Sequence, residues 1–379
     1  MKRIYYWSPC LNKVGTYKST INSAISLAKY SKKYEIKIIN SCGEWNDEKK
    51  NFLDNRIEII NFGFNYFKYL PKIGFFKSRF SYLLIILTSI IPLLRLLIKD
   101  KPEFFVVHLI TSLPLILMKL INTKTKFILR ISGFPKLNYF RNLLWKNISN
   151  RIDQVTCPSI DLLNQLNKKN IFDKNKIKFL PDPILNIKEF GNKKKSLEIN
   201  NQNKRKFFIS IGRLTKQKNF IYLINEFKKF SEINDNYDLY IFGEGDLKME
   251  LNNQIHKNKL ENKVFLKGYS KNIFPYLIRA EAFILSSLWE DPGFVLIEAA
   301  ACNLFIISSD CKNGPREFLD NGKNGILYES NKNGSLSFAI QQYFQTENKF
   351  KMKLNAKKNC RKYTLFHHYK YFENILNLN

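Results

Sequence analysis

Short apolar runs alternate with helix-like segments along the first half of the chain. Residues 3–7 and 35–39 are β-branched or aromatic runs, and between them Ile21, Ala24 and Ala28 recur at helical spacing. This order of strand, helix and strand predicts a parallel sheet. The same pattern predicts further strands at residues 57–61, 104–108, 126–131 and 154–157, and helices at residues 80–98, 112–121, 137–150 and 160–168.

The pattern restarts after a stretch with few apolar residues. Residues 188–206 are rich in Lys and Asn and include Gly191, which is typical of a linker or a surface loop. Beyond them, the sequence predicts an amphipathic helix at residues 220–230 and strands at residues 207–211, 239–242, 264–266, 282–285 and 305–308. We therefore predict an α/β fold with two doubly wound, Rossmann-like domains, which bind ligands at the carboxyl ends of their strands in the cleft between the domains.

Residues 82–98 form a nearly unbroken apolar run with Pro92 and Arg95 inside it. The run carries a charge and is slightly short for a membrane span, which needs about 20 apolar residues. A helix packed within the first domain, a helix lying on a membrane surface and a transmembrane helix are the three alternatives. The aromatic and basic segment at residues 64–80 favours contact with lipid and includes Lys68, Lys72, Lys77 and Arg79.

The excess of basic over acidic residues indicates what kind of molecule the protein binds. The 379 residues include 62 Lys and Arg against 32 Asp and Glu, a formal net charge of +30. This excess predicts an anionic partner, which would be nucleic acid, an acidic membrane surface or a phosphorylated small molecule. A general bias of the composition toward Lys, Asn and Ile would also explain part of the excess.

The cysteines and the N-terminus bear on the cellular compartment. The six cysteines form no Cys-x-x-Cys pair and no Cys/His cluster, which excludes a disulfide scaffold and predicts reduced thiols without a metal site. The first apolar run ends at Ser8-Pro9, so it is too short for a signal peptide. We therefore expect a cytoplasmic protein.

Residues 210–219 lie where a predicted strand ends and a helix begins. Backbone N–H groups at the start of that helix and the side chains of Arg213, Lys216 and Lys218 would converge on one point. Such a point favours an anion, most plausibly a diphosphate. A solvated basic loop is the alternative, because Lys is abundant throughout the chain.

Residues 289–300 place two carboxylates around a Pro-Gly turn. Glu290 would lie in the loop, and Glu298 would lie about a turn and a half into a helix that starts near Gly293. Ionised carboxylates only accept hydrogen bonds, so one could bind sugar hydroxyls and the other a ribose. The alternative is a charge that favours the helix N-terminus, together with an ordinary surface glutamate.

In this order and separation, the two segments resemble the retaining glycosyltransferases of family 4, which have the GT-B fold and an E-x7-E motif. The match is specific over residues 207–328, is only topological before them, and extends to residues 243–245, 264–269, 286–302, 313–317 and 321–325. The resemblance implies two Rossmann-like domains that face a central cleft. Residues 1–190 would bind the acceptor, residues 204–360 would bind the nucleotide sugar, and a C-terminal helix at residues 361–379 would cross back to the first domain.

The resemblance also implies roles for single residues. Arg213 and Lys218 would grip the donor diphosphate, and Glu290 would hold the donor sugar. The remaining donor contacts would be made by Glu298 to the ribose, by the backbone of Gly268 and Tyr269 to the nucleobase, and by the amides of Gly293, Phe294 and Val295 to the sugar or its phosphate. Asp291-Pro292 stands where many members carry Gly-Phe, which leaves open how this loop closes on the sugar.

The first domain matches the family less closely. Gly15 stands where a glycine-rich loop would approach the donor phosphates, although an ordinary turn glycine is an equal alternative. His108 ends a predicted strand and is a candidate for acceptor binding or for a structural role. Arg130 and Ser132 surround the position where many members carry a histidine beside the donor sugar, and this chain has no histidine there.

The family is described as using a same-face displacement in which the leaving diphosphate helps to deprotonate the incoming hydroxyl. Arg213, Lys218 and Glu290 would then be the catalytic residues. The chain has no Asp-x-Asp motif, so we expect neither a metal nor another cofactor, with a UDP or GDP sugar as the donor substrate.

We expect a hexose-type sugar to be transferred to a lipid-linked glycan of a bacterial surface polysaccharide, such as lipopolysaccharide or capsule. The enzyme would then make peripheral contact with the cytoplasmic face of the anionic inner membrane. Another GT-B enzyme, such as a nucleotide-sugar epimerase or a phosphorylase, and a non-enzymatic protein that binds anionic ligands are the alternatives. The basic residues are spread along the chain and match no nucleic-acid-binding motif, so we expect no nucleic-acid partner.

Overall fold

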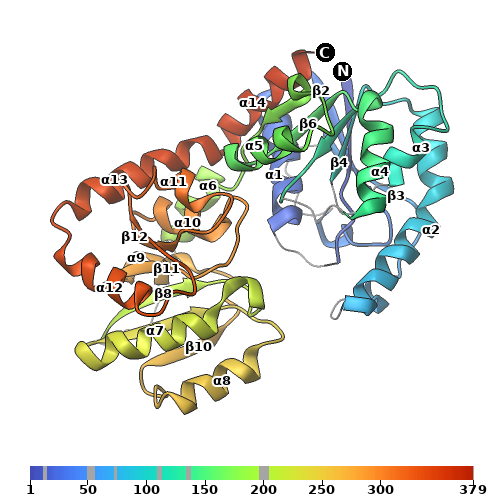
Figure 1. Ribbon diagram of the computed structural model, residues 1–379. Helices are drawn as coiled ribbons and strands as arrows, with labels where there is room; N and C mark the ends of the chain where they lie inside the picture. The colour runs from blue at the N-terminus through green and yellow to red at the C-terminus, as the bar shows by residue number, and fades with distance from the viewer. Residues whose placement is uncertain are drawn as a thin grey trace. The chain divides into compact units, whose positions relative to one another are not determined.

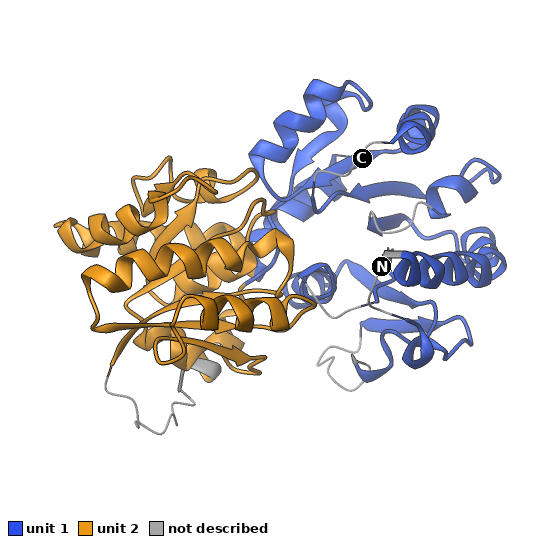
Figure 2. Ribbon diagram, turned by 60° about the horizontal axis from the view of Figure 1, so that its bottom comes forward, with its two compact units in different colours: residues 1–184, 365–379 blue, residues 185–364 orange. Residues whose placement is uncertain are grey.

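The chain folds into two compact units. The computed structural model describes residues 1–11, 15–48, 56–71, 75–108, 113–133, 138–195 and 205–378. Unit 1 comprises Met1–Ile184 and Leu365–Asn379, and unit 2 comprises Leu185–Thr364 (Figure 2). The corresponding boundaries predicted from the sequence are residues 190 and 361.

Unit 1 contains a parallel 7-stranded sheet in the order β3-β2-β1-β4-β5-β6-β7 (Figure 1). Its strands are β1 (Lys2–Trp7), β2 (Tyr34–Asn40), β3 (Ile57–Asn61), β4 (Phe104–His108), β5 (Lys126–Arg130), β6 (Gln154–Cys157) and β7 (Ile177–Phe179). Its helices are α1 (Gly15–Tyr30), α2 (Phe75–Lys99), α3 (Leu113–Leu117), α4 (Tyr139–Ile148), α5 (Ile160–Lys169) and α14 (Leu365–Asn377). Only β7 among these strands was absent from the sequence prediction.

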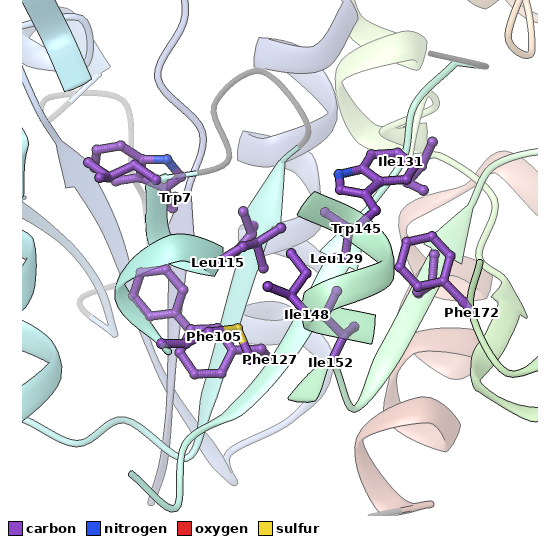
Figure 3. Packing of buried hydrophobic residues seen from close by; sticks show 14 of the residues in the cluster. Trp7, Phe105, Leu115, Phe127, Leu129, Ile131, Trp145, Ile148, Ile152 and Phe172 are labelled. Atoms are coloured by element: carbon purple, nitrogen blue, oxygen red, sulfur yellow. The ribbon is translucent and has the colours of Figure 1, made fainter. Parts of the chain in front are cut away.

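Both faces of the sheet are buried around its central strands, which explains why β4 and β5 are nearly continuous apolar runs. Side chains of a strand alternate between the two faces, so Tyr5 and Trp7 of β1 join one core cluster while Ile4 and Tyr6 join the other. Figure 3 shows the first cluster, in which Trp145 of α4 packs with residues of the sheet. Helices therefore have to cover both sides, as in doubly wound folds.

The C-terminal helix α14 packs on α1 and completes unit 1. Its His368 is buried, with Nε2 2.8 Å from the Ser23 hydroxyl and Nδ1 2.6 Å from the carbonyl oxygen of Pro181. Phe372 and Ile375 of α14 join the core cluster that contains Ile4. Residues at opposite ends of the chain thus share one core.

Acidification is expected to destabilise unit 1. Burial lowers the pKa of His368 to about 4 and that of His108 to about 3. An unfolded chain binds a proton at each imidazole below a pH of about 6.5, whereas the folded chain does not, so stability falls as pH drops below that value. The expected slope approaches about 1.4 kcal/mol per pH unit for each histidine.

Tryptophan fluorescence can follow this effect, because Trp7, Trp45 and Trp145 are all buried in unit 1. Thermal unfolding measured between about pH 7 and pH 5 should show the decline, and His368→Gln should make the slope shallower. An identical slope in His368→Gln would show that this histidine is not the cause.

Helix α2 packs on unit 1 through one face. Leu93, Leu96 and Leu97 belong to the core cluster that also contains Trp145. Among the described residues, the stretch Phe76–Lys99 is the one helix long and apolar enough to cross a membrane. An 18-residue part of it has a mean hydropathy of 2.2, and 33% of that part is buried. Its buried face agrees with the alternative in which the segment packs within the first domain.

Unit 2 contains a parallel 6-stranded sheet in the order β10-β9-β8-β11-β12-β13. Its strands are β8 (Lys206–Ile211), β9 (Tyr237–Phe242), β10 (Val264–Gly268), β11 (Ala282–Leu285), β12 (Phe305–Ser309) and β13 (Ile326–Tyr328). Its helices are α6 (Ile187–Lys195), α7 (Phe220–Ile233), α8 (Lys248–Lys257), α9 (Phe274–Arg279), α10 (Phe294–Ala301), α11 (Pro315–Phe318), α12 (Ser335–Gln345) and α13 (Lys349–Asn359). The two parallel sheets confirm the predicted fold class of two Rossmann-like domains.

The predicted linker at residues 188–206 is wrong at both of its ends. Residues 188–195 belong to α6, and Lys206 begins β8. Residues 196–204 lie outside the described residues. Lys and Asn make this segment polar without preventing a helix, because a lysine side chain keeps a helix propensity close to that of leucine.

Candidate functional site

Two loops at the carboxyl ends of neighbouring strands are joined in unit 2. The loop after β8 contains Gln217 and Lys218, and the loop after β11 contains Ser286, Leu288 and Trp289. The Leu288 amide donates to the Gln217 carbonyl at 2.8 Å, and the Gln217 side chain donates to the Trp289 carbonyl at 2.9 Å. The Ser286 hydroxyl donates to the Lys218 carbonyl at 2.7 Å. These bonds fix the two loops side by side where ligands of parallel sheets bind.

An ion pair between Lys218 and Glu290 lies where these loops meet. Lys218 Nζ is 2.5 Å from Glu290 Oε1, and the two side chains are 12% and 7% exposed. The hydroxyl of Ser287, which is fully buried, donates to the same oxygen at 2.5 Å. The carboxylate is therefore held in place by a cation and a hydroxyl through charge-assisted hydrogen bonds.

Gly212 makes room for the Lys218 side chain. A Cβ added at Gly212 would lie 2.8 Å from Lys218 Cε, 2.9 Å from Cδ and 3.0 Å from Cγ. The lysine therefore passes directly over the backbone of Gly212 on its way to Glu290. Gly212 and Ser287 were not among the predicted site residues, although each lies within a few residues of one.

Arg213 occupies the same loop at its surface. The side chain is exposed, and its Nη2 lies 3.5 Å from Oε1 of Gln217. Gln217 thus links Arg213 to the loop after β11, since it also bonds to Trp289. The predicted cations, Arg213 and Lys218, consequently belong to one hydrogen-bonded region.

Helix α10 begins at Phe294, close to the predicted start. Gly293 precedes it at a φ of +92°, and a Cβ added there would lie 3.7 Å from Glu290 Cβ. Phe294 and Val295 form the first turn, whose N–H groups have no partner within the helix itself. Glu298 follows one turn later and is half-buried. Glu290 and α10 are therefore neighbours, as the spacing predicted.

The turn before α10 departs from the family pattern and contains a cis peptide bond between Asp291 and Pro292. Gly314, at the start of α11, approaches this turn so closely that an added Cβ would lie 2.4 Å from the Pro292 oxygen. The carbonyl of Lys312 also accepts from the Glu290 amide at 3.2 Å. The loop after β12 therefore supports the loop that carries Glu290.

Glycines let the ends of β9 and β10 approach the loop after β8. A Cβ on Gly243 would lie 1.9 Å from the Gly212 oxygen, and one on Gly245 would lie 2.5 Å from the Leu214 oxygen. The Gly243 amide donates to the Gly268 carbonyl at 2.8 Å. A Cβ added at Gly268 would meet nothing within 4 Å, and Tyr269 beside it is 72% exposed. The predicted base-binding residues therefore border an accessible surface of unit 2.

Cys311 lies near this site without offering a reactive thiolate. Burial raises the pKa of its thiol to about 12, with a further contribution from the charge of Glu290. The thiol therefore stays protonated at neutral pH. A protonated thiol is a poorer nucleophile and a poorer metal ligand than a thiolate. Among the described residues, no group of three or more His, Cys, Asp or Glu side chains is placed to hold a metal ion.

The residues predicted for the acceptor side lie in unit 1, where Arg130 is buried in an ion pair. Its Nη2 is 2.6 Å from Asp182 Oδ1, and its Nη1 donates to the Leu180 carbonyl at 2.6 Å. Ser19 donates to the same carboxylate oxygen at 2.5 Å. The Arg130 charge is therefore already neutralised, which is typical of a structural role. Sequence analysis did not identify Asp182 as its partner.

His108 lies beside Arg130, since the two residues pair between β4 and β5. Its Nε2 is 3.3 Å from the Thr20 hydroxyl, and its Nδ1 has no hydrogen-bond partner among the described residues. Ser132 also has a buried hydroxyl without a partner in the described part of the chain. Gly15 is the first residue of α1, and residues 12–14 before it lie outside the described residues.

A model of the family described as glycosyl transferases group 1 matches residues 192–363. An uncharacterized glycosyltransferase of Methanocaldococcus jannaschii is 34% identical over 310 residues, which cover 77% of this chain and 73% of the relative. An N-acetylgalactosamine-N,N'-diacetylbacillosaminyl-diphospho-undecaprenol 4-alpha-N-acetylgalactosaminyltransferase of Campylobacter jejuni is 29% identical over 229 residues, which cover 58% of this chain and 61% of the relative.

Solved structures share the fold over the whole chain. The Anabaena protein HepE, in complex with UDP and glucose, matches with a TM-score of 0.73 and 13% identity, and the match covers 100% of both chains. At this identity the match concerns the fold alone.

Proposed function

Because the chain belongs to the glycosyl transferases group 1 family, we propose that it moves a hexose-type sugar from a nucleotide-diphosphate sugar to a hydroxyl group with retention of configuration. The observation that carries this proposal is the joining of the loops after β8 and β11, which brings Lys218, Ser287 and Glu290 within hydrogen-bond distance. A buried cation and a buried carboxylate side by side suit a ligand that combines an anion with hydroxyl groups.

In the proposed mechanism, Arg213 and Lys218 bind the donor diphosphate. Lys218 is paired with Glu290 in this structure, and the diphosphate would offer the same ammonium group a second anion. Glu290 would then accept hydrogen bonds from the sugar hydroxyls. Glu298 would bind the ribose, the amides of Gly293 and its neighbours in α10 would face the sugar, and Gly268 and Tyr269 would contact the nucleobase.

The transfer breaks the bond between the anomeric carbon and the diphosphate oxygen and forms a bond to the acceptor oxygen on the same face. The proton of the acceptor hydroxyl passes to the departing diphosphate. Negative charge grows on that diphosphate in the transition state, and Arg213 and Lys218 would stabilise it electrostatically. The proposal includes no metal ion and no further cofactor, with a UDP or GDP sugar as the donor.

We propose a lipid-linked glycan as the acceptor, in the assembly of a bacterial surface polysaccharide at the cytoplasmic face of the inner membrane. Support comes from the Campylobacter relative, whose name includes diphospho-undecaprenol. The net charge of +30 and the apolar helix α2 agree with work near anionic lipid.

Donor hydrolysis tests the reaction without knowledge of the acceptor. The purified chain is incubated with α-configured UDP-glucose, UDP-N-acetylglucosamine and GDP-mannose, and NMR identifies the anomer of the sugar that is first released. Retention predicts the α anomer from one of these donors. First release of the β anomer would contradict the retaining mechanism.

Gly212→Ala is expected to weaken nucleotide diphosphate binding by about tenfold, because an added methyl group displaces Lys218 from the diphosphate. Calorimetry with UDP and GDP measures the loss. Gly191→Ala is the matched control, since an added Cβ on this glycine of unit 2 meets nothing within 4 Å. Equal affinities in the two variants would show that the position of Lys218 is unimportant for binding.

A further inference from the structure

Helix α2, the long helix labelled in Figure 1, presents an apolar stripe to the outside of unit 1. Residues three, four or seven positions apart lie on one side of a helix, and the stripe follows this spacing. It consists of Phe76, Phe80, Leu83, Leu87, Ile91 and Ile98, which are 82%, 59%, 52%, 57%, 60% and 49% exposed. At 1.5 Å per residue it is about 33 Å long.

The exposed side of α2 differs from that of a helix that faces water, because it carries large apolar side chains. Ser81 and Ser89, which are polar, are fully buried together with Ile85 and Leu93, while large apolar side chains occupy the opposite side. A surface helix of a water-soluble protein normally directs polar side chains outward. A contiguous exposed apolar surface of this size is typical of an interaction site.

Basic residues flank the stripe on both sides. Lys77, Arg79, Arg95 and Lys99 are all exposed. Residues 59–99 contain six Lys and Arg and no Asp or Glu, and residues 104–152 contain eight Lys and Arg and again no Asp or Glu. A surface that is both apolar and uniformly cationic complements an anionic lipid bilayer.

Helix α4 extends this surface. Tyr139, Phe140 and Leu143 lie on one side of α4 and are 76%, 78% and 47% exposed. Helices α2 and α4 contribute to the same core cluster, so they cover the same face of the sheet. Burial, together with the nearby charge of Arg79 in α2, lowers the pKa of Arg141 in α4. The charges of Arg79 and Arg141, on different helices, are therefore close enough to interact.

We propose that the α2 stripe and the exposed aromatic residues of α4 form a docking surface for an anionic lipid bilayer. The apolar and aromatic side chains enter the interface between headgroups and acyl chains, and the flanking lysines and arginines bind lipid phosphates. This inference deepens the proposed function, because a lipid-linked acceptor would lie in the same bilayer. Helix α2 lies along the membrane surface in this arrangement.

Two other occupants fit the observations less well. A membrane-spanning α2 would have to remove Leu93, Leu96 and Leu97 from the core of unit 1. A second copy of the chain would bring two surfaces together whose flanking charges are all positive, and like charges repel unless anions separate them. An anionic bilayer supplies both the apolar interior and the opposite charge.

Vesicle flotation of the full chain tests the proposal. The protein is mixed with phosphatidylcholine vesicles, or with vesicles in which roughly a third of the lipid is phosphatidylglycerol. We expect binding to the anionic vesicles, with an affinity that falls about tenfold in Phe76→Ser/Phe80→Ser and in Lys77→Glu/Arg95→Glu. Phe338→Ser/Phe350→Ser is the matched control, since these phenylalanines of unit 2 are 65% and 73% exposed, and it should bind like wild type.

Absence of binding to anionic vesicles would overturn the proposal. An equal loss of vesicle affinity in the control and test variants would overturn it too. A dimer that dissociates in Phe76→Ser/Phe80→Ser, without vesicle binding by the wild type, would assign the surface to a second copy instead. Calorimetry with UDP and GDP separates this inference from the proposed function. Vesicle binding without nucleotide binding would overturn the transferase proposal and leave the docking surface in place.

Discussion

Glu290→Gln is expected to reduce sugar transfer by about a hundredfold or more, while nucleotide diphosphate binding stays near the wild-type level. The amide keeps the size of the side chain and loses its charge, so it binds sugar hydroxyls and the developing positive charge at the anomeric carbon less well. Lys218 loses the opposite charge of its partner at 2.5 Å and remains available to the diphosphate. The change therefore separates turnover from nucleotide affinity.

The measurement combines donor hydrolysis rates with calorimetry on the same sample. Glu329→Gln is the control, because this glutamate of unit 2 is 69% exposed and also pairs with a lysine, Lys332. It should behave like wild type in both assays. A Glu290→Gln variant with wild-type turnover would remove Glu290 from the proposed mechanism.

Asp182→Ala is expected to destabilise unit 1 by about 3–5 kcal/mol, since it leaves the Arg130 guanidinium charged and without its partner inside the core. The two side chains are 2% and 4% exposed, so water cannot replace the lost carboxylate without opening the fold. Denaturant unfolding, followed by the fluorescence of the buried tryptophans of unit 1, measures the change.

The double variant Arg130→Met/Asp182→Ala makes this test specific for charge. It removes the guanidinium as well, so it should be more stable than Asp182→Ala alone although it lacks two side chains. If both variants were equally destabilised, lost packing and not the uncompensated charge would be the cause. A stability equal to that of the wild type would show that the pair is not buried in solution.

Much of the fold could be predicted because its strands are buried on both faces. Such strands form dense apolar runs, as at residues 104–108, where the predicted and observed strands are identical. β7 and β13 were missed because each has three residues, too few to show a period. α6 was missed because its Lys and Asn residues are also typical of a loop.

The candidate site in unit 2 could be located from sequence because its parts are local. Glu290 lies eight residues before Glu298, at the beginning of a helix whose start the Pro-Gly turn marks. Ser287 also lies close to Glu290 in sequence, and a search for hydroxyl groups near each carboxylate would have found it. Gly212 could not be found in this way, because its role depends on the path of the Lys218 side chain.

The ion pair between Arg130 and Asp182 in unit 1 could not be located from the sequence. Arg130 and Asp182 are 52 residues apart, and neither residue type is unusual in a polar loop. Only the parallel order of β5, β6 and β7 brings the two side chains together in the core. The outward stripe of α2 is likewise hidden in sequence, because the helix is apolar on both sides and its period does not indicate which side is buried.

Calorimetric titration of the purified chain with UDP, GDP and ADP in the absence of metal tests the central claim most directly. We predict that UDP or GDP binds selectively, and that Arg213→Ala weakens this binding by about tenfold or more, because a charge-assisted contact to the diphosphate is lost. A folded protein that binds none of these nucleotides, or that binds one equally well without Arg213, would contradict a donor site at the joined loops after β8 and β11.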